Sequence, residues 1–176
     1  MTFKSNINRQ AASGLGGLAV PTLKQNLIAE AIGSFFLVVA AIGSCILARD
    51  VLHADLAMTV LINAIAVAAV LFALIETFGA VSGSHFNPAV TIALFATKQM
   101  TRKKTATYMG AQFAGGCLGL VATQLMFYDT NPAILVISDN TKTLPLLLSE
   151  FIGTFLLIGV IIGLSLIHIS EPTRPY

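Results

Sequence analysis

The sequence predicts an all-α membrane protein with four spanning helices and one re-entrant half-helix. Of its 176 residues, 56% are hydrophobic and only 10% are charged, whereas a soluble domain carries about 25% charged residues. Four apolar stretches approach the roughly 20 residues that a spanning helix needs. They cover about 27–48, 56–78, 106–127 and 145–167. Because the connecting segments are short, we expect residues 27–167 to form one membrane domain.

Basic residues gather on one side of this predicted domain. They precede the first span or follow the half-helix: Lys4, Arg9, Lys24, Lys98, Arg102, Lys103 and Lys104. In the loops on the other side, the only basic residues are Arg49 and Lys142. By the positive-inside rule, the N-terminus and the half-helix loop face the cytoplasm of a multi-pass protein in the cell membrane. The basic cluster is thus an orientation signal and does not predict nucleic-acid binding.

Residues 1–26 are predicted to form a cytoplasmic tail. A signal peptide is the alternative, because Lys4 and Arg9 precede an apolar patch at Leu15–Val20. That patch is short and rich in glycine, which disfavours a signal peptide.

The run from Ser82 to Thr91, Ser-Gly-Ser-His-Phe-Asn-Pro-Ala-Val-Thr, is a polar loop that opens directly into an apolar helix. Asn87 suits the N-cap and Pro88 the first helical position. This leaves the Asn87 amide as a donor beside the positive end of the helix. The helix is too short to cross a bilayer, so residues 82–97 are predicted to enter the membrane and stop partway. Non-helical backbone at that depth implies a pore or a buried site.

The same run resembles the first Asn-Pro-Ala loop of the major intrinsic protein family, the aquaporins and their glycerol-conducting relatives. The pattern Ser-Gly-x-His-x-Asn-Pro-Ala-Val-Thr is long and specific, and the likeness extends over about 27–164. It implies an aquaporin-like inverted-repeat bundle that passes water or small neutral solutes such as glycerol. The resemblance also implies a homotetramer in the lipid bilayer when the protein is full length.

The resemblance further implies the residues of the site. Glu30, Glu150 and Gln112 would brace pore loops, and Glu30 would hold residues 83–86 extended so that their carbonyl oxygens form a ladder of acceptors. Gln112 would bond the loop backbone. The alternative for Glu30 is a glutamate that extends to the membrane interface. The residues expected to line the pore are Gly83, Ser84, His85, Phe86, Asn87, Pro88, Ala89 and Val67.

An internal repeat relates the first and fourth spans at an offset of 120 residues. Residues of the first span recur in the fourth: Glu30, Ile32, Gly33, Phe35, Leu37, Ile42 and Gly43 match Glu150, Ile152, Gly153, Phe155, Leu157, Ile162 and Gly163. Three spans lie between the starts of the two copies, so the second copy begins on the opposite face. This is an inverted-topology repeat, which places a site between two halves.

The second copy is expected to be truncated after its opening span. Residues 165–176 break the apolar pattern, and we interpret them as a non-native tail; a natural short terminus is the alternative. A second Asn-Pro-Ala, Asn131–Ala133, follows Asp129-Thr130 and is predicted to be an ordinary turn.

Several residues have two interpretations. His85 either lines the pore or is a neutral imidazole that braces the loop, and Glu76 either lines the pore mouth or extends to the headgroups. Cys45 and Cys117 are predicted to be small buried apolar residues. The Gly115-x-x-x-Gly119 spacing predicts close helix packing.

The sequence therefore predicts a passive channel for water or small neutral solutes that is incomplete in this chain. It shows no clustered nucleophile and base, no metal-ligand spacing and no phosphate loop, so we expect no enzyme, no metal and no cofactor. An inverted-repeat secondary transporter is the main alternative, and a non-conducting fragment is the other. A transporter needs ion-coordinating charge at its site, whereas the motif offers an amide and a helix dipole.

Overall fold

The computed structural model describes residues 20–130, 132 and 143–170, without the side chains of 162 and 164–170. These residues form helices and contain no strand, which confirms the predicted all-α bundle. In chain order the elements are α2 (Leu23–Ile46), the π-helix η1 (Leu47–Val51), α3 (Leu56–Ser82), α4 (Pro88–Ala96), α5 (Arg102–Met126) and α6 (Leu144–Ser170).

Local capping decides where these helices begin and end. α2 begins earlier than predicted because Thr22 and Gln25 form a capping box, in which Thr22 N donates to Gln25 Oε1 at 2.8 Å. α3 begins at the N-cap Asp55, whose Oδ1 accepts from Met58 N at 2.8 Å. It continues beyond the predicted end to Gly83, whose φ of 90° is left-handed and costs glycine little.

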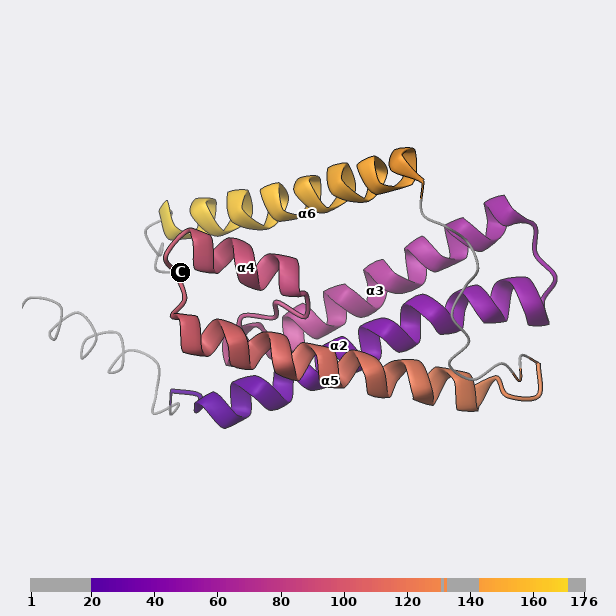
Figure 1. Ribbon diagram of the computed structural model, residues 1–176, viewed down its shortest axis with the longest axis horizontal. Helices are drawn as coiled ribbons and strands as arrows, with labels where there is room; N and C mark the ends of the chain where they lie inside the picture. Colours follow the sequence, from indigo (N-terminus) through magenta and orange to yellow (C-terminus); the bar gives the residue numbers. More distant parts are fainter. Residues whose placement is uncertain (1–19, 131, 133–142, 171–176) are drawn as a thin grey trace, which may run out of the picture.

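α2 is the central helix and packs against both α3 and α5 (Figure 1). α4 lies beside α5 over only the half of the bundle where α5 begins, so α4 is a half-helix (Figure 1). Gly115 and Gly119 of α5 lie against the backbone of α2, and a Cβ at either position would collide with Ala31 or Phe35. The predicted close packing at this pair of glycines is therefore confirmed.

Three helical segments in the described part of the chain are long and apolar enough to cross a membrane: Leu23–Val51, Leu56–Ser82 and Leu144–Ile161. α5 corresponds to the remaining predicted span, and its 25 residues extend over about 37 Å, more than the roughly 30 Å hydrocarbon core. It is less apolar because its buried face is partly polar, with Thr105, Tyr108, Gln112 and Thr123. Large apolar side chains elsewhere are exposed, as expected where helices face lipid.

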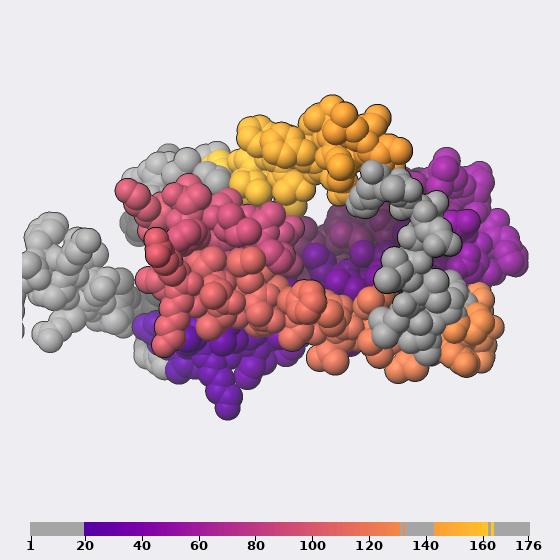
Figure 2. Space-filling model, viewed as in Figure 1, coloured from indigo at the N-terminus to yellow at the C-terminus, as the bar shows by residue number. Residues whose placement is uncertain are grey.

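α6 lies along the outside of the bundle and contacts α4 (Figures 1 and 2). α2 and α3 are visible through a hollow between α5 and α6 (Figure 2). The helix continues through residues 165–170, where the sequence predicted that the apolar pattern ends. Two predicted segments lie partly outside the described residues: the N-terminal tail at 1–19 and the C-terminal tail at 171–176. Of the turn predicted at Asn131–Ala133, only Pro132 is described.

Candidate functional site

The half-helix begins inside the bundle at Asn87. The side-chain Oδ1 of Asn87 accepts a hydrogen bond from Ala89 N at 2.8 Å, and Pro88 occupies the first helical position. Thr91 reinforces the cap, because its Oγ1 donates to Asn87 O at 3.1 Å. Since Oδ1 is used in the cap, the donor group left on Asn87 is its amide N–H₂.

The loop before the half-helix is held by the buried carboxylate of Glu30 on α2. Oε1 accepts from Ser82 Oγ at 2.6 Å and from His85 N at 3.0 Å. Oε2 accepts from Phe86 N and from Gln112 Nε2, both at 2.8 Å. Glu30 is fully buried, and these donors replace the water that a buried carboxylate loses. Glu30 therefore contacts the loop, and its side chain does not extend to the membrane interface.

Gln112 is linked to the loop indirectly, by hydrogen bonds to Glu30 and to Thr91 of α4. The sequence prediction that Gln112 bonds the loop backbone is wrong, because its Nε2 donates to the Glu30 carboxylate and to Thr91 Oγ1 at 2.9 Å. Its Oε1 is buried and has no hydrogen-bond partner among the described residues. The amide thus ties α5 to both α2 and the first turn of α4.

The loop backbone is not extended, contrary to the sequence prediction for residues 83–86. Gly83, Ser84 and Phe86 have φ values of 90°, 50° and 47°. The left-handed region is costly for a bulky residue such as Phe86. The turn is stabilised because it lets two successive N–H groups, those of His85 and Phe86, face one carboxylate. Phe86 O belongs to the expected ladder of carbonyl oxygens, and it accepts a long hydrogen bond of 3.4 Å from Ser34 Oγ.

The side chain of His85 braces the loop. Its Nδ1 lies 3.1 Å from Thr91 Oγ1, and its ring centroid is 5.1 Å from that of Tyr108. Because Thr91 Oγ1 donates to Asn87 O, the hydrogen-bond network assigns the imidazole proton to Nδ1. His85 is not among the residues that line the cavity described below. The geometry therefore favours the bracing interpretation over the pore-lining one.

The end of α3 is supported by two residues that sequence reasoning missed. Tyr108 donates its hydroxyl to Ser82 O at 2.8 Å. Asn26, with its amide oriented by the hydrogen-bond network, donates to Val81 O at 2.9 Å. A signal was present in the sequence, because Asn26 precedes Glu30, and Tyr108 precedes Gln112, by four residues. Polar side chains with this spacing share one face of a helix.

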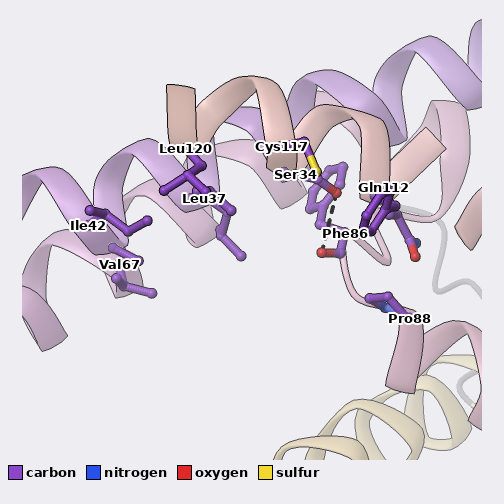
Figure 3. A pocket seen from close by; sticks show the side chains of 13 residues that line it. Ser34, Leu37, Ile42, Val67, Phe86, Pro88, Gln112, Cys117 and Leu120 are labelled. Atoms are coloured by element: carbon purple, nitrogen blue, oxygen red, sulfur yellow. Dashed lines mark hydrogen bonds between the residues drawn. The ribbon is translucent and has the colours of Figure 1, made fainter. Parts of the chain in front are cut away.

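An open cavity of about 470 Å³ lies between α2, α3, α5 and the loop (Figure 3). Of the predicted site residues, Val67, Phe86, Pro88 and Gln112 line it. Asn87 lies between two lining residues, and none of the 13 lining residues is charged. The remaining predicted pore residues are not among those that line it: Gly83, Ser84, His85, Asn87 and Ala89.

Glu150, the repeat counterpart of Glu30, has a different environment. Its side chain is exposed on α6, and α6 contacts α4 rather than the helices around Glu30. Glu76 is also exposed, on α3. Among the described residues, no group of three or more His, Cys, Asp and Glu side chains could hold a metal ion.

Comparison with known proteins matches residues 18–168 to the model of the major intrinsic protein family. The chain is 40% identical over 142 residues to aquaglyceroporin AqpS of Rhizobium meliloti, which covers 80% of this chain and 59% of that protein. It is 34% identical over 148 residues to nodulin-26 of Glycine max, and the match covers 84% of this chain and 53% of that protein. It is 36% identical over 117 residues to a probable aquaporin, AqpM, of Archaeoglobus fulgidus, and the match covers 62% of this chain and 45% of that protein.

The chain thus spans about half the length of the relatives that it matches. The family match itself covers most of the chain and includes α2 to α5, the half-helix loop and the cavity. The chain belongs to the major intrinsic protein family.

Proposed function

We propose that the protein is a passive channel that admits small uncharged solutes such as glycerol as well as water. Family membership implies a membrane channel for water or small solutes and not an enzyme. The finer proposal depends on one observation: Pro88, the first residue of the half-helix, and Phe86, in the loop before it, both line a cavity whose lining residues carry no charge.

The chemistry of this arrangement suits neutral molecules with oxygen atoms. The Asn87 amide can donate a hydrogen bond to a hydroxyl or water oxygen. The N-terminus of α4 carries a positive partial charge, which opposes cations at the same place. The carboxylate of Glu30 is engaged by the loop and Gln112, which disfavours a secondary transporter that binds a coupling ion there.

Val67 supports the wider choice of permeant. It lines the cavity together with Ile42 and Leu37 (Figure 3), and it stands twenty residues before Asn87. A small apolar side chain leaves room for a carbon skeleton, whereas an aromatic side chain at the same place would fill it. We therefore propose that Val67 sets the width of the path for solutes.

The test is flux into proteoliposomes. Because the chain spans about half the length of its relatives, we use a fusion of the chain with the portion of the Rhizobium meliloti relative that it does not match. We call this fusion the extended channel. We expect water and glycerol flux that is indifferent to proton and sodium gradients, and a Val67→Phe variant that loses glycerol flux while it keeps water flux.

Two results would contradict the proposal. Flux driven by an ion gradient would indicate a transporter. Water flux without glycerol or urea flux, unchanged by Val67→Phe, would indicate a water-specific pore.

We also propose, from the same family likeness, that the protein forms a homotetramer in the cell membrane. A measurement of the mass of the complex in detergent would test this oligomeric state.

A further inference from the structure

The aromatic ring of Phe86 lies directly against the backbone of α2 at Gly33. A Cβ built at Gly33 would overlap ring atoms Cδ1, Cε1 and Cζ of Phe86. The ring is nearly buried and packs edge-on against Phe78, with centroids 6.3 Å apart. Any side chain at position 33 must therefore displace the ring.

One face of α2 holds Phe86 at three points. Glu30 accepts from its N–H at 2.8 Å, Gly33 receives its ring, and Ser34 donates to its carbonyl oxygen at 3.4 Å. Positions 30, 33 and 34 share a helix face, because residues three and four apart are neighbours on the helix surface. These contacts oppose the cost of a left-handed φ of 47° at an aromatic residue. The placement of Phe86 is thus specific to this helix face.

Phe86 also belongs to the wall of the cavity, next to Pro88 and Ser34 (Figure 3). Phe86 thus contacts Gly33 through its ring and is also part of the cavity wall. A ring displaced from Gly33 would have Phe78 on one side and the cavity on another.

We infer that Gly33 is a specificity-determining position: by having no side chain, it lets the Phe86 ring withdraw from the cavity and so sets the cavity's width where the loop borders it. Gly33 acts through Phe86 and touches no permeant itself, so it is a positioning residue. This inference depends on the proposed channel function.

The experiment compares Gly33→Ala with Gly110→Ala in the extended channel. Gly110 lies on α5, where a Cβ meets nothing within 4 Å, and it is not part of the internal repeat, so Gly110→Ala is the control for adding one methyl group to a helix. We expect Gly33→Ala to lower the glycerol-to-water permeability ratio about tenfold, the scale of one methyl group in a tight pocket. The control should leave the ratio unchanged.

A second change separates a positioning role from general damage. Removing the ring with Phe86→Ala in the Gly33→Ala background should restore the ratio to the wild-type value or above it. Phe86→Ala alone should raise the ratio. If Gly33→Ala does not fold, as judged by gel filtration in detergent, Phe86→Ala alone decides the matter, and a ratio that fails to rise overturns the inference.

Other outcomes would also overturn it. Wild-type flux with a ratio that Gly33→Ala leaves unchanged refutes the role of Gly33 while the channel function stands. An equal loss of water and glycerol flux, not rescued by Phe86→Ala, would show structural damage only. Absence of any wild-type flux would instead refute the proposed function.

Discussion

The carboxylate of Glu30 accepts a hydrogen bond of 2.8 Å from the side-chain amide of Gln112, although 82 residues separate them in sequence. The contact joins α2 to α5, and the same carboxylate also binds the loop that starts the half-helix. The geometry of the candidate site therefore depends on the packing of α2 against α5.

Glu30→Gln is expected to destabilise the protein strongly. A glutamine at this place would present an N–H₂ group to donors that now share a carboxylate, so at least one buried group would lose its partner. We expect a loss of about 3 kcal/mol in the free energy of unfolding, measured by thermal unfolding in detergent. Glu150→Gln, the exposed repeat counterpart, is the control and should cost far less; equal losses would contradict the bracing role of Glu30.

Gln112→Glu should be more destabilising than Gln112→Leu. The glutamate would place a second carboxylate against Glu30, and two like charges in a buried site repel strongly. Leucine loses two hydrogen bonds but also removes the buried Oε1 that has no partner among the described residues. Thermal unfolding of the two variants, side by side, tests this order. The reverse order would show that the volume of the side chain matters more than its charge.

Asn87→Asp should separate the capping role of Asn87 from its donor role. Aspartate caps a helix about as well as asparagine, so we expect a change in stability of less than about 1 kcal/mol. The side chain loses its N–H₂ donor and gains a negative charge, so glycerol flux should fall and cation leak should rise. Flux equal to that of the wild type would show that the Asn87 amide does not contact the permeant. Asn87→Ala, which loses both roles, should reduce stability as well.

The proposed orientation predicts which sites are accessible from outside the cell. A cysteine introduced at Asp139 should react with a membrane-impermeant thiol reagent added to intact cells, and one at Arg102 should not, because the positive-inside rule predicts that the basic residues from Lys98 to Lys104 face the cytoplasm. Permeabilised cells provide the control, in which both sites should react. If only the cysteine introduced at Arg102 reacts in intact cells, the orientation is the opposite of the one proposed.

The 176-residue chain, reconstituted by itself, is expected to give no water flux above that of empty liposomes. Its cavity is lined by α2, α3, α5, the loop and the first residue of α4, while α6 contacts α4, so the described helices enclose the proposed path on one side. The shared charge bias makes all copies insert in the same orientation, which prevents two copies from facing each other as an inverted pair. Water flux from the bare chain would show that it forms a sealed pore.

Much of the local structure could be predicted from the sequence. Asn87 and Pro88 determine the start of α4, because capping depends on residues only a few positions apart. The apolar stretches likewise predict the long helices, although the caps at Thr22 and Gly83 move their ends. Glu30 stands out as a carboxylate within an apolar span and within the internal repeat, and its bracing role was predicted from the family likeness.

The tertiary structure decided the remaining features. The partners of Gln112, the left-handed backbone of Phe86 and the contact of its ring with Gly33 all depend on how α2 and α5 are rotated against each other. No local rule determines that rotation, since it follows from side-chain packing between helices far apart in the sequence. The sequence by itself therefore determined where the half-helix begins and which faces are apolar, whereas the packing of α2 determined the conformation of the loop and the walls of the cavity.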